Sequence, residues 1–325
     1  MVTTLNDNNI GILKMQQTAV SSNPSAVPAR ASSVGIDWGA SCRRVYVFGT
    51  DGARLALHED REGTLAARGS IAVSLDALVG RLGIDWRVPV IVSGIAGYGH
   101  RAQLVPCLDL EVPLTLLARQ LVQLGARRIA VPGYVQVTPH ADVMRGQSTH
   151  LLGLVVGGGG DGWAVLPGTY SKWVYLRRGR VVHWRTFVTG ELFDSQRHLG
   201  TVAPLLESQW SDDPAGFDLG LELARSGMSL SQALYSMRAA IANGAVAAGL
   251  AAPMLSGLLI GAEFQAICQA GVRDRSLQLI AHAPQRALYE RAAAAFGWET
   301  EALDAHGVFG AAVRHLAQSA EVWTR

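Results

Sequence analysis

Two stretches about half the chain apart follow one pattern of strand, Gly-containing polar turn, strand, tight turn and strand. The first comprises Val34–Ser41 (V-G-I-D-W-G-A-S), Arg43–Phe48, the turn Gly49–Gly52 and Ala53–His58. The second begins at Trp163, turns through Gly168, Thr169 and Ser171, and continues through R-R-G-R into V-V-H-W-R-T-F-V. Repetition of one supersecondary unit predicts a duplicated, two-lobed α/β fold with a central cleft.

The first turn has the chemistry of a metal–polyphosphate site. Gly39 lets the backbone approach a bulky ligand, and the turn formed with Ala40 and Ser41 can direct N–H groups at an anion. Asp37, where the strand ends, can hold a hydrated Mg²⁺. A strand follows this turn, whereas a helix follows the phosphate-binding turn of Rossmann and P-loop proteins. The alternative is an ordinary hairpin with a solvated Asp near its tip.

The second turn offers a cation in addition to its backbone. Gly168 and Thr169 form the turn, and Lys172 follows as a point charge able to neutralise phosphate. Two such turns, facing each other across a cleft, can hold the phosphates of a nucleotide from both sides. This plan resembles the actin, hexokinase and Hsp70-type ATPase superfamily, with its ribonuclease-H-like lobes. The resemblance implies binding of ATP with Mg²⁺ and makes Asp37 the expected metal residue.

Composition excludes several other classes. At 325 residues, 49% hydrophobic and 17% charged, the chain is long and apolar enough for two domains with buried cores. A net charge of +2 leaves no nucleic-acid-binding footprint. The cysteines, Cys42, Cys107 and Cys268, lie far apart without a C-x-x-C pair, which argues against zinc and disulfides and fits a reducing cytoplasm.

The sequence divides into a tail and two lobes. Residues 1–33 are polar and rich in Ser, Thr, Asn and Pro, and we expect a disordered tail without a signal peptide. The first lobe is expected at 34–156 and the second at 163–325. Between them, 157–162 begins with four glycines, which form either a flexible link between the lobes or a surface loop.

Asp142 is the expected catalytic residue of the first lobe. We expect helices at Ser70–Leu82, Leu114–Leu124 and Thr149–Val156, with strands at Pro89–Ser93 and Arg128–Pro132. Asp142 precedes the third of these helices, at the place where sugar kinases of the superfamily keep the general base. The equal alternative is a helix N-cap. Arg145 either holds a carboxylate or phosphoryl group or forms a surface salt bridge.

An apolar run dominates the second lobe. Ala245–Ile260 ends in a G-x-x-x-G pattern, which also occurs in membrane dimers, but Pro253 and Glu263 favour a buried helix under the nucleotide site. Further helices are expected at Phe217–Arg225, Ser229–Ala240, Arg286–Phe296 and Val308–Ala317, and strands at Leu277–Ala281 and Trp298–Leu303. Thr189 and Glu191 lie where a further helix begins. Their spacing is too short for a capping box, so a contact of these residues in the cleft remains an alternative.

Several motifs narrow the resemblance. They are I-D-W-G (36–39), V-M-R-G (143–146), L-L-G (151–153), P-G-T-x-x-K-W (167–173), R-T-x-x-T-G-E-L (185–192) and L-S-G-L-L-I-G-A-E (255–263). In this order, across nearly all of 34–317, the chain resembles the 2-dehydro-3-deoxygalactonokinase family. The resemblance implies MgATP-dependent phosphorylation of the C6 hydroxyl of 2-dehydro-3-deoxy-D-galactonate in galactonate catabolism. It implies a cytoplasmic enzyme with a small sugar-acid substrate and no nucleic-acid or membrane partner, and it leaves a homodimer open.

The resemblance also implies roles for individual residues. The catalytic residues would be Asp142 and Arg145. The nucleotide would be bound by Asp37, Gly39, Ala40, Ser41, Gly168, Thr169, Lys172 and His282. The sugar acid would be bound by Gly97, Arg101, Thr189 and Glu191.

The chain departs from the family pattern at four places. Gln147-Ser148 replaces a usual Glu-Glu, His282-Ala283-Pro284 replaces a Gly-Ser pair near the expected adenosine pocket, and the loop 97–101 and Tyr170-Ser171 also differ. These departures keep two alternatives open. One is a kinase for another keto-deoxy sugar acid, and the other is a catalytically impaired regulatory protein that binds a sugar acid or nucleotide.

Overall fold

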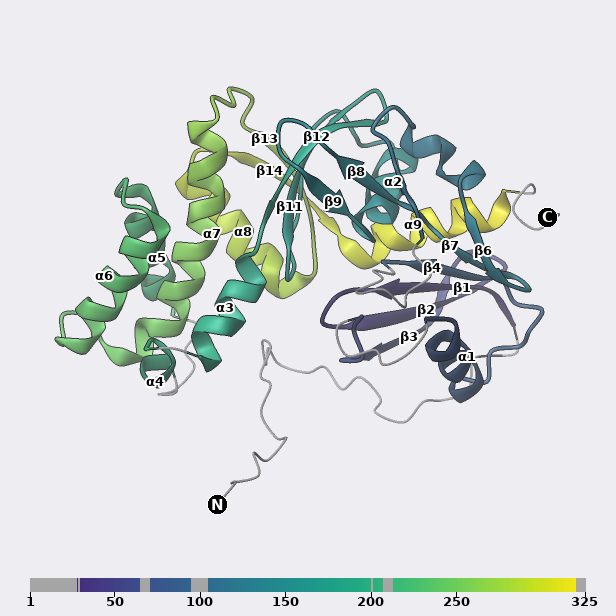
Figure 1. Cartoon of the computed structure of the whole chain (residues 1–325), viewed down its shortest axis with the longest axis horizontal. Coiled ribbons are helices and arrows are strands. Elements are labelled where there is room, and N and C mark those ends of the chain that lie inside the picture. The colour runs from purple at the N-terminus through teal and green to yellow at the C-terminus, as the bar shows by residue number, and fades with distance from the viewer. Residues whose placement is uncertain are drawn as a thin grey trace, which may run out of the picture.

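Two mixed sheets with helices between and beside them make up the molecule (Figure 1). The computed structural model describes residues 28, 30–64, 71–94, 105–199, 201–206 and 213–319. The first sheet has the order β3-β2-β1-β4-β7-β6. Its strands are β1 (Ala31–Trp38), β2 (Arg43–Gly49), β3 (Arg54–Asp60), β4 (Val90–Ser93), β6 (Val122–Gly125) and β7 (Arg128–Ala130).

The second sheet repeats the plan of the first. Its order is β12-β11-β10-β13-β14. The strands are β10 (Gly162–Leu166), β11 (Ser171–Arg177), β12 (Arg180–Phe187), β13 (Ser276–Ala281) and β14 (Glu299–Asp304). In both sheets the first three strands pair antiparallel and the next two add in parallel. The predicted duplicated α/β fold is therefore confirmed.

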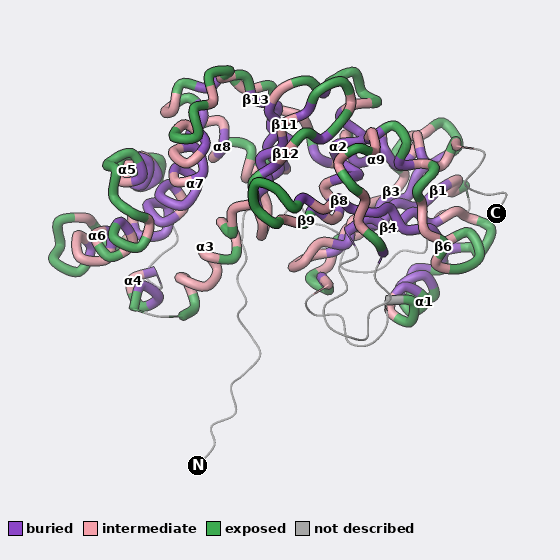
Figure 2. The backbone as a smooth tube through the Cα atoms, turned by 45° about the horizontal axis from the view of Figure 1, so that its top comes forward, coloured by how far each residue is buried: buried purple, intermediate pink, exposed green. Residues whose placement is uncertain are grey.

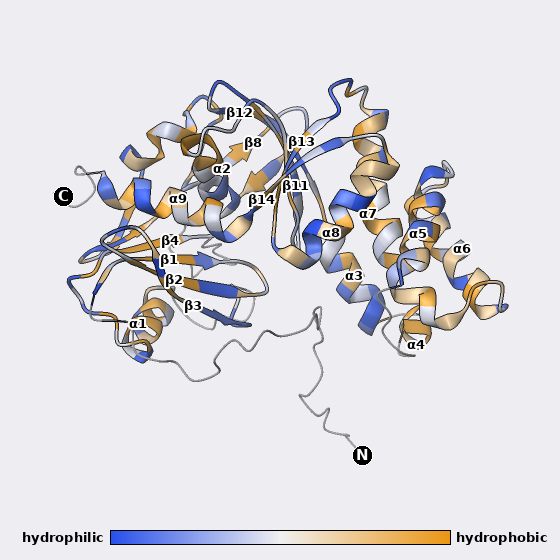
Figure 3. Cartoon of the chain, turned by 180° about the vertical axis from the view of Figure 1, so that it is seen from behind, coloured by the Kyte–Doolittle hydropathy of each residue, from blue (hydrophilic) through white to orange (hydrophobic). Residues whose placement is uncertain are grey.

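Two helices lie between the sheets and contact each other. They are α2 (Gln147–Val156) and α9 (Ala305–Gln318), and α9 also packs on strands of both sheets (Figures 1 and 3). Glycines make this close packing possible. A Cβ at Gly35 would lie 2.6 Å from Val313, and one at Gly153 would clash with the Val308 carbonyl at 1.9 Å. The helix α1 (Ile71–Arg81) covers hydrophobic residues of the first sheet.

The remaining helices pack beside the second sheet and extend to the far end of the second lobe (Figure 1). They are α3 (Thr189–His198), α4 (Ala203–Leu206), α5 (Pro214–Arg225), α6 (Leu230–Ala242), η2 (Ala248–Leu250), α7 (Ala251–Gln269) and α8 (Ala283–Ala295). By length and composition α7 could cross a membrane, yet most of it is buried (Figure 2). A Cβ at Gly257 would lie 2.0 Å from the Phe217 carbonyl, so the G-x-x-x-G face packs on α5. The prediction of a buried helix is confirmed, although α7 begins at Ala251 and extends to Gln269, and its predicted place under the nucleotide site stays a prediction.

The structure corrects two predicted segments. Strand β1 begins at Ala31, inside the expected tail, because Ala31 pairs with Gly49. The helix expected at Leu114–Leu124 is the shorter 3₁₀ helix η1 (Leu114–Arg119), and the chain then forms β6, which pairs with β7. Leu114 and Leu117 are buried at a spacing that both helix types share, and strand pairing decides the rest.

A third, small sheet positions Asp142. Its strands are β5 (Cys107–Leu108), β8 (Gly133–Gln136) and β9 (Asp142–Met144). Asp142 pairs with Gln136 at the start of β9, and the N-cap of α2 is Gly146. The N-cap alternative for Asp142 is therefore wrong, because the pairing of β9 with β8 extends the chain through this residue.

Candidate functional site

The two Gly-containing turns meet. The hydroxyl oxygens of Ser41, in the turn after β1, and Thr169, in the turn after β10, are 2.7 Å apart. These residues belong to opposite sheets and are separated by 128 positions. The sequence repeat thus brings two polar turns, each at the end of the first strand of its own sheet, to one place.

Asp37 lies next to the first turn. Its side chain is 13% exposed, and its carboxylate faces the Arg44 guanidinium at 3.9 Å. A Cβ at Gly146 would lie 3.0 Å from Gly94 and 3.9 Å from the Asp37 carboxylate, so the start of α2 abuts the end of β1. Gly146 has a φ of 85°, a conformation that suits glycine. The result is a half-buried carboxylate beside a turn and a helix N-terminus.

Asp142 and Lys172 form an ion pair from opposite lobes. The Lys172 ammonium donates to Asp142 at 3.4 Å, to the Val143 carbonyl at 2.9 Å and to the Thr186 hydroxyl at 2.5 Å. Thr186 in turn donates to Asp142 at 2.6 Å. Burial lowers the pKa of Lys172, and the neighbouring Asp142 opposes this shift. Because the Asp142 carboxylate receives two bonds from β11 and β12, the second lobe fixes its orientation.

Arg145 follows Asp142 in the segment that leads into α2. Its guanidinium donates to the Val105 carbonyl at 2.7 Å and so ties this segment to the chain just before β5. The hydroxyl of Ser93, at the end of β4, donates to the Gly146 carbonyl at 3.2 Å and contacts Thr149 at 2.6 Å. These bonds hold the start of α2 against the parallel strands of the first sheet.

A buried carboxylate accepts hydrogen bonds from the second turn and from residues next to it. Glu263 of α7 is 1% exposed and accepts hydrogen bonds from Ser171 and Trp173 at 2.7 Å each. Tyr289 donates at 2.7 Å, and Thr189 makes a further short bond. Burial raises the pKa of Glu263, while these four donors act to lower it. Sequence reasoning missed this role, because Glu263 marked only the end of an apolar run.

The segment 189–191 packs on the second turn. The Glu191 amide donates to the Thr169 carbonyl at 3.2 Å, and a Cβ at Gly190 would lie 2.6 Å from the Gly168 carbonyl. The Thr189 hydroxyl is used by Glu263. Thr189 and Glu191, predicted to bind the sugar acid, therefore lie against the turn itself. Gly97 and Arg101 lie outside the described residues.

His282 lies at the N-terminus of α8, close to α9. Its ring centroid is 4.3 Å from that of His306. Burial, with Arg44 and two neighbouring histidines, lowers the pKa of His282 to about 2. Its Nδ1 is buried without a hydrogen-bond partner among the described residues. Because Arg44 contributes to this pKa shift, His282 interacts electrostatically with the start of β2.

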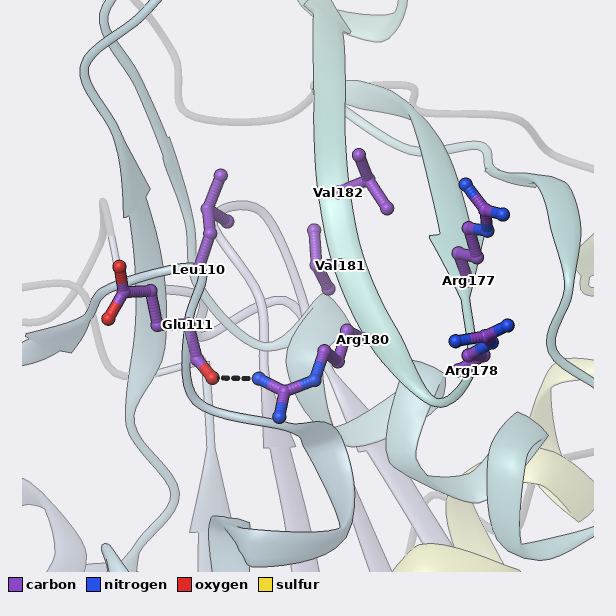
Figure 4. Close-up of a pocket in the computed structure, with 7 residues that line it drawn as sticks. All are labelled: Leu110, Glu111, Arg177, Arg178, Arg180, Val181 and Val182. Carbon is purple, nitrogen blue, oxygen red and sulfur yellow. Dashed lines mark hydrogen bonds between the residues drawn. The ribbon is translucent and has the colours of Figure 1, made fainter.

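A shallow surface hollow lies elsewhere, at the turn between β11 and β12 (Figure 4). Arg177, Arg178 and Arg180 line it together with Glu111, whose backbone carbonyl accepts a bond from Arg180. Ser171 begins β11 and Arg177 ends it, so this hollow is at the opposite end of the strand from the second turn. It contributes nothing to the site of the two turns.

Known proteins resemble the chain over nearly its whole length. The model of the 2-keto-3-deoxy-galactonokinase family matches residues 37–316. A Rhizobium meliloti (strain 1021) protein named "Probable 2-dehydro-3-deoxygalactonokinase DgoK1" is 32% identical over 89% of this chain and 96% of its own. The 2-dehydro-3-deoxygalactonokinase of Escherichia coli (strain K12) is 27% identical over 89% of this chain and 98% of its own.

A solved structure shares the fold. A Sinorhizobium meliloti crystal structure described as a 2-dehydro-3-deoxygalactonokinase protein superposes with a TM-score of 0.77 at 28% identity. The match covers 90% of this chain and all of the other. Sequence and fold therefore agree on one group of relatives.

Proposed function

Because the chain belongs to the 2-keto-3-deoxy-galactonokinase family, and so is a kinase acting on a sugar acid, we propose that it uses MgATP to phosphorylate the C6 hydroxyl of 2-dehydro-3-deoxy-D-galactonate. The observation that carries the proposal is the meeting of Ser41 and Thr169, 2.7 Å apart. It supports a shared site in which two turns of opposite lobes contact the same phosphates.

Asp37 and the start of α2 fit the metal–phosphate end of this site. Asp37 keeps 13% of its side chain exposed, and a helix N-terminus beside it favours anions. Asp37 would hold Mg²⁺ through water, since this cation prefers oxygen ligands and keeps part of its hydration shell. When bound, Mg²⁺ would neutralise charge on the transferred phosphoryl group. The turn N–H groups of Gly39, Ala40, Gly168 and Thr169 would contribute further donors.

Asp142 would accept the proton of the sugar-acid hydroxyl. The bonds from Lys172 and Thr186 orient its carboxylate. Phosphoryl transfer depends mostly on positioning and charge neutralisation, and a positioned base adds to both. Lys172 would neutralise negative charge at the same place, and Arg145 or Arg101 would attract the acceptor carboxylate.

Entry of a nucleotide requires the two turns to separate. Ser41 and Thr169 now occupy each other's hydrogen-bonding directions, so phosphate oxygens would have to replace this direct contact with two new ones. Closure of the lobes over both substrates would then exclude water, which otherwise competes as the phosphoryl acceptor.

Coupled ADP release with a panel of keto-deoxy sugar acids tests the proposal. We expect turnover that requires 2-dehydro-3-deoxy-D-galactonate, and a product whose NMR spectrum carries phosphate at C6. Asp142→Asn should lower kcat by about 10²- to 10⁴-fold with little change in MgATP affinity. Absence of acceptor-dependent ADP release from folded protein would overturn the assignment.

Gln147 favours a second candidate, a kinase for another keto-deoxy sugar acid. Its Oε1 is buried without a hydrogen-bond partner among the described residues, one position from Gly146. A neutral amide there could accept a bond from an acceptor hydroxyl of different stereochemistry. Ser148, the other departure, is fully buried and donates to the Pro132 carbonyl, so it faces the core. The same acceptor panel separates the two candidates by their kcat/KM values.

A further inference from the structure

Three metal-ligating side chains converge where β13 and β14 end. They are His282, just after β13, Asp304, which ends β14, and His306, in the first turn of α9. The strands are parallel neighbours, and Ala281 pairs with Asp304, so their C-terminal ends coincide. One ligand atom of each side chain lies within 4.8 Å of the others.

His282 supplies an unsatisfied ring nitrogen. Its Nδ1 is buried and, within the described part of the chain, has no hydrogen-bond partner. Buried polar atoms normally have a partner, and one without a partner calls for an explanation such as an unseen ion. The ring of His306 lies next to it, with centroids 4.3 Å apart, so a single ion between the imidazoles would satisfy this nitrogen.

His306 and Asp304 are oriented by bonds that leave a ligand atom on each. The Nδ1 of His306 is 3.0 Å from the Tyr46 hydroxyl, which leaves Nε2 available. A metal-ligating histidine commonly uses its second ring nitrogen in this way. One oxygen of Asp304 accepts the Gly307 amide at 3.0 Å, and because Asp304 is exposed, its other oxygen can be reached from solvent.

We propose that His282, Asp304 and His306 bind a divalent transition metal of the zinc class. Two imidazoles and a carboxylate suit Zn²⁺ and its neighbours, whereas Mg²⁺ prefers oxygen ligands alone. Zinc–nitrogen bonds are about 2.0–2.1 Å, so modest side-chain rotation would bring the three ligand atoms to one ion. Three protein ligands leave an open coordination position.

The site would connect the two lobes. Tyr46 belongs to β2 of the first sheet, while Asp304 ends β14 of the second sheet and His282 directly follows β13. An ion on His306 would therefore fix the start of α9 to the loop after β13, while the Tyr46 bond ties the same ring to the first sheet. This proposal does not depend on the identity of the sugar acid.

Co²⁺ titration of tag-free, chelator-treated full-length protein tests the site. Co²⁺ reports its coordination through visible absorption, and Zn²⁺ should displace it. We expect one ion per chain, a Tm raised by saturating Zn²⁺, and no displacement by excess Mg²⁺. His282→Ala, His306→Gln and Asp304→Asn should each weaken binding at least tenfold. Asn at 304 can still cap α9, so loss of binding there would not reflect a lost cap.

His198→Ala is the matched control, because His198 is an exposed histidine on α3. It should bind Co²⁺ like the wild type. Circular dichroism in the presence of chelator checks that each variant is folded. Absence of saturable binding, or equal affinity in the wild type and all three ligand variants, would overturn the proposal. Equal loss in His198→Ala would do the same, since binding would then be spread over surface histidines.

Discussion

The two hairpin units share a backbone plan but are anchored in different ways. In the first, the buried guanidinium of Arg43 pairs with Asp60 at 2.6 Å and Glu62 at 2.5 Å, whose side chains are 33% and 59% exposed. In the second, Glu263, 1% exposed, collects donors from four side chains. Topology places both turns, whereas the residues behind each turn decide how firmly it is held.

The units also differ in the charged group that lies beside each turn. The first has the Asp37 carboxylate, and the second has the buried Lys172 ammonium, which is paired with Asp142. A cation-binding group and a cation on opposite sides suit a substrate that arrives as a metal–phosphate complex. The comparison predicts that the second unit is more sensitive to substitution than the first.

Removal of the Lys172 charge should have the largest effect. In Lys172→Met we expect kcat/KM to fall by about 10²- to 10³-fold, because a preorganised charge is lost and Asp142 loses its ionic partner. Steady-state ADP release measures this. Arg177→Met, at the exposed end of the same strand, is the control and should behave like the wild type. Equal activity of Lys172→Met and wild type would contradict a role for Lys172 in the cleft.

Glu263→Ala should cause the next largest effect. It leaves buried donors on Ser171, Trp173 and Tyr289 without their acceptor. We expect the free energy of unfolding to fall by at least about 3 kcal/mol in urea titrations. Glu222→Ala, at an exposed position of α5, should change it by less than about 0.5 kcal/mol. If both variants unfold at the same urea concentration, Glu263 does not anchor the turn.

The first anchor should contribute less. Arg43→Met is expected to lower the free energy of unfolding by about 1 kcal/mol, and by less at high salt, because its carboxylate partners are solvated. Arg87→Met, whose side chain is 73% exposed, serves as the control. Destabilisation equal to that of Glu263→Ala would remove the contrast between the two units.

The direct contact between the turns should have the smallest effect. A double-mutant cycle of Ser41→Ala and Thr169→Ala should give a coupling of about 0.5–1.5 kcal/mol in unfolding free energy without nucleotide. With saturating MgATP the coupling should shrink, since phosphate would separate the hydroxyls. A coupling that MgATP leaves unchanged would mean that the nucleotide does not enter between the turns.

Local sequence patterns predicted the repeated hairpin unit. The wrong predictions fell where strand pairing between separate segments determines the structure. Gly-containing turns between apolar strands were enough to predict both hairpin units. The segment after Leu114 reads as a helix by its apolar spacing, yet Val122–Gly125 is a strand because β7 offers it a partner. From the sequence, Asp142 fits the role of a helix N-cap as well as that of a general base. Its pairing with Gln136 in the small sheet excludes the N-cap.

The supporting residues of the site could not be predicted because their partners are distant in sequence. Glu263 meets Ser171 across 92 positions and Tyr289 across 26. The proximity of His282 and His306 likewise depends on the parallel register of two strands. The local signal at Glu263 was a single charged residue in an otherwise uncharged, largely apolar helix.

Calorimetric titration of MgATP into variants of each turn tests the central claim most directly, that turns of both lobes hold the nucleotide phosphates. Ser41→Asp and Thr169→Asp place a negative charge in the first and second turn, respectively. The account predicts that each variant, while folded, binds MgATP at least tenfold more weakly than the wild type, because like charges repel at a shared phosphate site. Wild-type affinity in either variant would contradict it.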